Sequence, residues 1–314
     1  MAEDGKTTEQ KNLYNLKKLS LSGSALEERR LCELYELSFA AADSILELYG
    51  SGLGLYEALA VLSEESFERS LSIHSGALLQ NVHWLGLWQG TTETLDKTVF
   101  CKMLADRLAE RGISVKEADF LESERVTPSV VYVRNQLSDE AFEVFSDELA
   151  DPTVRYVQSF KEAISAVENG EAGYCLLPLE EKGVRLHSVC SLLYSKDLKI
   201  GSVTPVFGFD GSADMKYALV SKCFSVPETL AEDDRYLELR ISREGRLSEL
   251  LSVAEYYGSE VYKIGTVYYD GEEGPVTQYS LIFKEEGRDF VPILLYLTLF
   301  TADFIPVGIY RNIE

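Results

Sequence analysis

The sequence predicts a mixed α/β and α+β protein with three structural parts. Between 25 and 112, apolar residues recur at helical spacing only. Between 130 and 220, short apolar runs alternate with helical segments, which is typical of a three-layer α/β domain. Residues 236–312 follow the order strand, helix, strand, strand, helix, strand of a ferredoxin-like domain. The expected division is a flexible arm at 1–24, a helical domain at 25–125, an α/β domain at 126–228 and a ferredoxin-like domain at 235–314.

The charge of the chain argues against two classes of partner. The 314 residues carry a formal net charge of -22, so the surface repels a phosphate backbone or an anionic membrane. The longest apolar stretch, Gly76–Trp88, is interrupted by polar residues and is too short to cross a bilayer. The N-terminus lacks the apolar core of a signal peptide. We therefore expect a cytoplasmic protein that binds neither nucleic acid nor membrane.

Cysteine and histidine usage predicts no metal site and no cofactor. The 5 Cys are scattered without a CxxC pair, and the 3 His have no metal-ligand spacing. We expect reduced and mostly buried thiols.

The helical part contains three segments with clear helical patterns. Ala25–Tyr49 carries an apolar stripe and ends at Gly50-Ser51-Gly52. A second helix is expected from Tyr56 to about Ser70, and a third over Thr94–Arg111, with Gly112 as its stop. The segment between them, Ser72–Trp88, stays ambiguous.

The stretch Ser159–Gly183 is the best defined part of the α/β domain. Ser159 and Glu162 have the spacing of a capping box, and Asn169-Gly170 provides the helix stop. Tyr174–Leu179 is an unbroken apolar run, as expected of a strand buried on both faces, with Pro178 marking its end. The following residues, 179–183, leave the carboxyl end of this strand, where open α/β sheets bind ligands.

The remaining α/β elements complete an alternating pattern. Ser138 is expected to cap a helix that continues to Leu149, and a further helix is expected over Val184–Tyr194. This alternation predicts a parallel sheet with right-handed crossovers. The other expected strands are Val130–Val133, Val154–Val157, Lys199–Val206 and Tyr217–Val220.

The α/β stretch resembles the prephenate dehydratase domain. The turn 170–173 reads GEAG where that family has "GEAD", and 178–182 reads PLEEK where the family has "PIENS". Residues 138–141, SDEA, keep the end of the family's glycine-rich turn without its glycines. The resemblance implies a periplasmic-binding-protein-like lobe. It makes Ser138, Glu180 and Lys216 candidate catalytic residues and Glu181, Lys182 and Tyr217 candidate ligand-binding residues.

Two departures from the family predict the loss of dehydratase chemistry. The family's second lobe would fall between the last two strands, where this chain has only Phe207–Asp214. The family's "TRF" segment corresponds to Met215-Lys216-Tyr217. Methionine cannot donate a hydrogen bond, and lysine lacks the bidentate fork of arginine. A lost hydrogen-bond donor typically costs about 10²–10⁴ in rate.

The C-terminal domain resembles the ACT domain that follows prephenate dehydratase. Gly245-Arg246-Leu247 stands where those domains have "GAL", and 263–268 stands where they have "IESRP". The resemblance implies a small carboxylate or amino-acid ligand at Gly245, Arg246 and Leu247, and a regulatory role.

The leading interpretation is a ligand-binding or regulatory protein linked to phenylalanine biosynthesis, without dehydratase activity. The alternative is an active enzyme of that pathway. It would be a prephenate dehydratase, which is a lyase, or a chorismate mutase in the helical domain. Asp43–Leu48 resembles the mutase family's "D..IL.LL" pattern, with Arg29, Arg30, Arg69 and Lys97 as cations. A third interpretation is a structural dimer without a small ligand.

The ACT resemblance predicts a homodimer through residues 236–312. The segment Phe290–Phe300 is apolar nearly all round, so a second copy or the helical region must cover it. We expect light scattering to give the mass of a dimer at micromolar concentration. A monomer mass would contradict this prediction.

Overall fold

The computed structural model describes residues 25–62, 94–120, 126–207, 213–224, 234–243, 247–271, 274–286, 289–301 and 304–311. The chain divides into two compact units, residues 1–115 with 298–300 and residues 116–297 with 301–314. The predicted arm at 1–24 and the ambiguous segment 72–88 lie outside the described residues. No helix in the described ranges is long and apolar enough to cross a membrane.

The first unit contains the helices α2 (Ala25–Gly50), α3 (Leu55–Leu62) and α6 (Thr94–Glu110). One arginine in α6 and one just after its end join it to α2. The Arg107 guanidinium lies 4.3 Å from the ring centre of Tyr35 and 4.5 Å from that of Phe39. Arg111 forms an ion pair with Asp43 at 2.5 Å. These contacts use charged side chains to hold two helices together.

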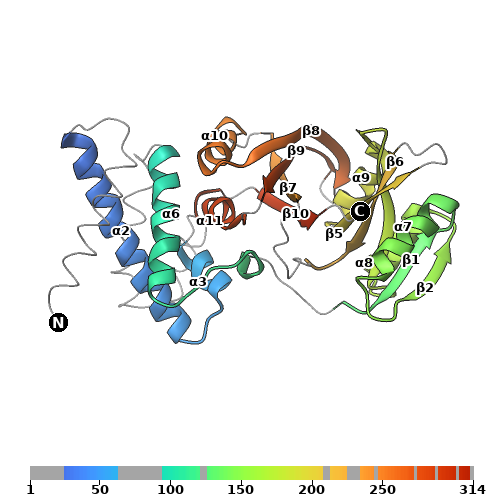
Figure 1. Cartoon of the computed structure of the whole chain (residues 1–314), viewed down its shortest axis with the longest axis horizontal. Coiled ribbons are helices and arrows are strands. Elements are labelled where there is room, and N and C mark those ends of the chain that lie inside the picture. The colour runs from blue at the N-terminus through green and yellow to red at the C-terminus, as the bar shows by residue number, and fades with distance from the viewer. Residues whose placement is uncertain are drawn as a thin grey trace. The chain divides into compact units, whose positions relative to one another are not determined.

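The second unit begins with the short helix η1 (Glu117–Phe120) and continues into an α/β domain (Figure 1). Its sheet has the order β2-β1-β3-β6-β5, and β4 pairs with the end of β3. The elements are β1 (Ser129–Val133), α7 (Gln136–Ser146), β2 (Thr153–Val157), α8 (Phe160–Glu168), β3 (Tyr174–Glu181), β4 (Val184–Arg185), α9 (His187–Ser195), β5 (Lys199–Phe207) and β6 (Ala213–Ser221).

Helices cover both faces of this sheet and give the predicted three layers. On one face, Ala141 and Phe145 of α7 pack with Tyr132 and Tyr217 of the strands. On the other face, α8 and α9 share a core with the opposite side chains of β1, β3 and β6. Strand β3 is buried along most of its length, as the sequence predicted.

Among the strands that were predicted, the prediction of a parallel sheet is wrong at one, β6; the short strand β4 also pairs antiparallel with β3. β1 pairs in parallel with β2 and β3, whereas β6 is antiparallel to both β3 and β5. A parallel crossover needs a dozen or more residues. Only residues 208–212 separate β5 from β6, so the two strands form an antiparallel pair.

Three local expectations are also corrected. Pro178 does not end β3, because the ladder absorbs it through a register shift between Pro178 and Glu180. Asn135, not Ser138, is the N-cap of α7, and Ser138 occupies the third helical position of the capping box. The helix expected over 184–194 begins later, because residues 184–185 form strand β4.

The capping box predicted at α8 is present in part. Ser159 accepts a hydrogen bond from the Glu162 N–H, while the Glu162 carboxylate accepts from Gln158, one residue before the cap. Asn169 ends the helix and Gly170 follows with a φ of +73°, as the sequence predicted.

The C-terminal part of the second unit has the predicted order of elements. Its antiparallel sheet has the strand order β10-β7-β9-β8, which is that of a ferredoxin-like domain, with α10 and α11 on one face (Figure 1). The elements are β7 (Asp234–Ser242), α10 (Leu247–Tyr257), β8 (Glu260–Gly271), β9 (Gly274–Glu286), α11 (Val291–Phe300) and β10 (Phe304–Arg311).

The other face of this sheet packs on the α/β domain. Tyr236, Ile282, Val307 and Tyr310 belong to the same apolar core as α8 and α9. Along β7, Leu237 and Leu239 alternate with Glu238 and Arg240, and all four side chains are buried. The two predicted domains therefore form one compact unit with a partly polar interface.

Helix α11 is buried within a single chain. Leu294, Leu295 and Leu297 are at most 1% exposed, and Phe300 packs edge-to-face with Phe100 of the first unit. These contacts do not test the dimer through residues 236–312, which stays a prediction.

A close backbone approach between β5 and β10 gives a test of the interface. A Cβ added at Gly308 would lie 2.3 Å from the Ile200 carbonyl oxygen. We expect Gly308→Ala to lower the free energy of unfolding by about 1–3 kcal/mol, because the backbones must move apart. Urea denaturation measures this loss. Gly265→Ala is the control, since its Cβ meets nothing within 4 Å. Equal stability of the two variants would contradict the close approach.

Candidate ligand site

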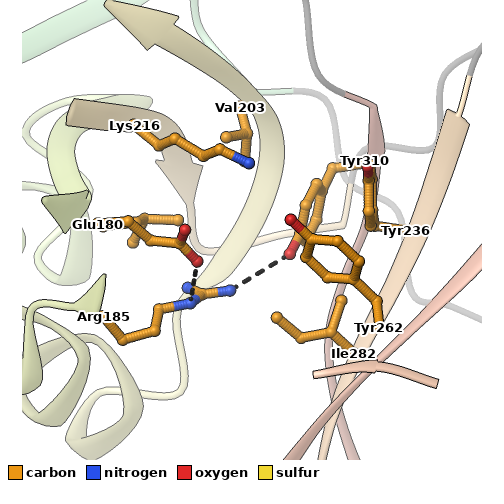
Figure 2. Close-up of a pocket in the computed structure, with 9 residues that line it drawn as sticks. Glu180, Arg185, Val203, Lys216, Tyr236, Tyr262, Ile282 and Tyr310 are labelled. Carbon is orange, nitrogen blue, oxygen red and sulfur yellow. Dashed lines mark hydrogen bonds and ion pairs between the residues drawn. The ribbon is translucent and has the colours of Figure 1, made fainter. Parts of the chain in front are cut away.

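A cleft lies between the α/β sheet and the ferredoxin-like sheet (Figure 2). Its empty volume is about 290 Å³, including space open to solvent. One wall comes from β3 to β6 and the other from β7 to β10. The lining residues are Leu179, Glu180, Arg185, Val203, Lys216, Tyr236, Tyr262, Ile282 and Tyr310.

Glu180 is the acidic group at the α/β wall of the cleft. It is 6% exposed, and its Oε1 atom accepts from Arg185 Nε at 3.0 Å and Lys263 Nζ at 3.2 Å. The Lys263 ammonium also donates to the Gly183 carbonyl oxygen at 3.0 Å. Glu180 is thus neutralised by two cations, one from each side of the cleft.

Arg185 connects Glu180 to a fully buried carboxylate on the opposite sheet. Its Nη2 atom lies 2.5 Å from Glu238 Oε2, and Glu238 is 0% exposed. The hydroxyls of Tyr194 and Tyr310 also donate to Glu238, at 2.5 and 2.8 Å. Burial, and then the Glu238 charge, raises the pKa of both tyrosines well above the usual value, so both remain donors. Arg185 Nη1 is buried without a hydrogen-bond partner in the described part of the chain.

Lys216 is the cation whose charge remains available in the cleft. It is the cross-strand partner of Glu180 in the β3–β6 ladder. Among the described residues, no carboxylate forms a salt bridge with its ammonium. Its Nζ atom instead lies 6.0 Å from the centre of the Tyr262 ring, across the cleft (Figure 2). An anion entering the cleft would meet this ammonium group.

Three tyrosines form the opposite wall. The Tyr236 ring is 5.1 Å from Tyr262 in an edge-to-face arrangement and 5.8 Å from Tyr310 in a stacked one. Tyr236 and Tyr310 are buried, whereas Tyr262 is 44% exposed. The wall therefore presents an aromatic surface that a flat apolar group can contact.

Two of the strands that line the cleft, β3 and β8, have a register irregularity beside it. One lies between Pro178 and Glu180, and the other between Val261 and Lys263. Consecutive strand residues normally point to opposite faces, and a bulge changes this. Leu179 and Glu180 both line the cleft, and Tyr262 lines it while Lys263 reaches Glu180. The bulges thus place neighbouring side chains on one site.

A second polar cluster holds the two domains together away from the cleft. Arg240 donates to Asp197 at 2.9 Å and to the Tyr269 hydroxyl at 2.9 Å. Lys199 donates to Asp197 at 2.9 Å and to the Pro306 carbonyl oxygen at 3.1 Å. Burial lowers the pKa of Lys199, and Asp197 opposes this effect.

The structure brings together two of the predicted site residues and separates the others. Glu180 and Lys216 line the cleft. Ser138 is buried at the start of α7, where its hydroxyl donates to the Val133 carbonyl oxygen at 2.9 Å. Tyr217 and Met215 pack on the same α7 face of the sheet, away from the cleft. Burial raises the pKa of Tyr217, while a hydrogen bond with the Asn135 side chain works in the opposite direction.

The remaining predicted residues do not reach the cleft. Glu181, the last residue of β3, and Lys182, in the turn after it, are exposed. Leu247 is the first residue of α10, and Gly245 and Arg246 lie outside the described residues. Of the cations considered for mutase chemistry, Lys97 is buried over the Phe300 ring at 5.2 Å. Within the described ranges, no group of three His, Cys, Asp or Glu could hold a metal ion.

Sequence reasoning missed Arg185 and the three tyrosines of the cleft. One signal was available, because β7 alternates leucine with Tyr236, Glu238 and Arg240. This alternation predicts that β7 has one buried and one exposed face. A polar network can bury the second face as well.

The chain is similar in fold to solved prephenate dehydratase structures. The enzyme from Streptococcus mutans matches with 15% identity and a TM-score of 0.47, covering 59% of this chain and 99% of that one. The Arthrobacter aurescens enzyme in complex with L-Phe matches with 14% identity and a TM-score of 0.42, covering 58% and 90%. GqqA, a quorum quenching acylase, matches with 18% identity and a TM-score of 0.40, covering 59% and 95%. At these identities the likeness concerns the fold alone.

No protein-family model matches the sequence, and no curated protein matches it.

The buried Arg185–Glu238 pair gives a testable stability difference. We expect Glu238→Leu to cost about 3–5 kcal/mol in the free energy of unfolding, because a buried cation and two hydroxyls lose their acceptor. The double variant Arg185→Met with Glu238→Leu should recover much of this loss. Urea denaturation of the three proteins measures the coupling.

Glu171→Leu is the control for this experiment. Glu171 pairs with Arg155 at 3.2 Å, and both side chains are more than half exposed. We expect a loss of about 1 kcal/mol or less. If Glu238→Leu is no more destabilising than Glu171→Leu, the buried network does not stabilise the interface.

Proposed function

We propose that this chain is a ligand-binding protein with a prephenate dehydratase-like fold that lacks dehydratase activity and binds a small carboxylate. The observation that carries the proposal is Lys216. Its ammonium lines a cleft with an aromatic wall and has no salt-bridge partner among the described residues, while the other cations beside the cleft are paired with carboxylates.

The loss of dehydratase chemistry is supported by two features of the chain. Only residues 208–212 lie between β5 and β6, so no second lobe closes over the α/β sheet at that point. Met215 stands where the prephenate dehydratase family has a threonine. Its side chain packs on the α7 face and carries no hydroxyl. The residues described at this point therefore provide neither a hydroxyl that could donate to the leaving group of the substrate nor a second binding lobe.

The carboxylate ligand is supported by the composition of the cleft. Ligand pockets are mostly apolar, with a few polar groups that orient the ligand. The empty space of this cleft includes open solvent, so a ligand bound at Lys216 would remain partly exposed. A charge-assisted bond to Lys216 would anchor a carboxylate.

The alternative of a rebuilt enzyme needs the N-terminal helical region as a second wall. In the described structure the second wall consists of Tyr236, Tyr262, Ile282 and Tyr310. A regulatory role fits this position, because a ligand there would contact both the α/β domain and the ferredoxin-like sheet.

We expect purified protein not to convert prephenate to phenylpyruvate. The measurement is phenylpyruvate formation followed by absorbance, with an active prephenate dehydratase as the positive control. Turnover on the order of 1 s⁻¹ or faster would refute the proposed loss of activity.

We expect Lys216→Met to weaken carboxylate binding. Loss of one charge-assisted hydrogen bond removes about 1.5–3 kcal/mol of binding free energy, or about 10- to 100-fold in Kd. Titration calorimetry with phenylpyruvate, L-phenylalanine and 3-phenylpropionate measures the effect. Lys222→Met is the matched control, because Lys222 is exposed just after the same strand. Unchanged binding in Lys216→Met would remove Lys216 as the anchor.

A further inference from the structure

We propose that the ion pair between Lys263 and Glu180 is a latch that keeps the cleft closed. When this pair opens, the segment 260–266 of the edge strand β8 moves away from the α/β domain and widens the cleft. The part of the inference that concerns ligand entry rests on the proposed carboxylate-binding function, whereas the movement of the strand does not.

The cleft is nearly closed in the structure. Its enclosed part has room for about one water molecule, and the rest of its empty volume is open to solvent. The Lys216 ammonium lies 6.0 Å from the centre of the Tyr262 ring on the opposite wall, so no organic group fits between these two side chains. A ligand can therefore contact both walls only if one of them moves.

Strand β8 forms the wall that is held least firmly. It lies at the edge of its sheet and pairs only with β9 among the described strands. Tyr262 is the extra residue of the β8 bulge and has no partner in the ladder, which weakens the backbone pairing at this point. The described hydrogen bonds and ion pairs between segment 260–266 and the α/β domain all come from one ammonium group, that of Lys263.

The contacts on either side of this segment are positioned to serve as the hinge. On β7, the completely buried Glu238 is paired with Arg185. Near the other end of β8, the Tyr268 carbonyl oxygen accepts a hydrogen bond from Ser191 of α9 at 2.8 Å. Breaking a buried ion pair leaves an uncompensated charge, whereas a partly exposed pair exchanges its partner for water at little cost. The Lys263 side chain is 31% exposed, so the latch opens before the buried network does.

Hydrogen exchange measures the latch without any ligand. We expect Lys263→Met to speed amide exchange over 260–266 by about two- to fivefold at neutral pH, because the contact with Glu180 is lost. Exchange over β7 should stay unchanged. Glu260→Gln is the control, since Glu260 is exposed at the start of the same strand. Exchange over 260–266 that is no faster in Lys263→Met than in the control would overturn the latch.

A double variant that conserves charge tests whether the latch controls ligand entry. Glu180→Gln combined with Lys263→Met removes one carboxylate and one ammonium, so the net charge around the cleft stays the same. We expect titration calorimetry to show 3-phenylpropionate binding about two- to fivefold more tightly than to the unmodified protein, because the ligand no longer has to open the ion pair. A purely structural ion pair would give equal or weaker binding, and that result would refute the role of the latch in entry. If the double variant does not fold, the exchange measurement on Lys263→Met still decides whether the latch exists.

The two measurements separate this inference from the function on which one of them rests. Faster exchange over 260–266 without binding of 3-phenylpropionate by any of the proteins keeps the latch and refutes the carboxylate-binding function. Binding that depends on Lys216, together with unchanged exchange in Lys263→Met, refutes the latch and keeps that function.

Discussion

The carboxylate of Glu238 is the group on which the second unit depends most. It is completely buried between two sheets that are separate in sequence, and it satisfies Arg185, Tyr194 and Tyr310 at once. Burying a charge without partners is costly, so this carboxylate requires the β4 turn and helix α9 to stand beside β7. The interface is thus held by direction-dependent bonds as well as by apolar contact.

This polar interface also explains why a cleft exists beside it. Side chains chosen only for apolar packing fill an interface to near crystalline density. A network of arginine, carboxylates and phenols instead fixes its members at hydrogen-bond distances and orientations. The space between Lys216 and Tyr262 lies next to that network and is not filled by either domain. Glu180 and Arg185 therefore both line the cleft and take part in the ion pairs that hold the two sheets together.

The sequence predicted those features that depend on short-range chemistry. The end of α8 at Asn169-Gly170 and the buried strand after it follow from capping and apolar runs within a few residues. The ferredoxin-like order follows from the hydrophobic pattern, which changes between the period of a strand and the period of a helix. A glycine stands on each side of the β8–β9 turn. Glu180 and Lys216 are among the candidate site residues that the sequence predicts, and the ladder places them opposite each other.

The features that were missed depend on contacts between distant segments. Glu238 and Arg240 alternate with leucines in the pattern of a half-exposed strand, and only the α/β domain on the second face explains their burial. Met215 and Tyr217 were grouped with Lys216 because they are adjacent in sequence, but strand alternation directs them to the α7 face. Pro178 normally ends a central strand, and here a bulge beside the cleft accommodates it.

The path of α11 has a consequence for how the chain can be divided. The backbone leaves the second unit at Leu297, contributes Thr298–Phe300 to the first, and returns at Thr301. The two units are therefore tied by three backbone crossings, not by one linker. A cut after Val115 severs only one of them, and removing the N-terminal segment would strip Phe300 of its contact with Phe100. Modular exchange of the helical segment between proteins would have to carry the end of α11 with it.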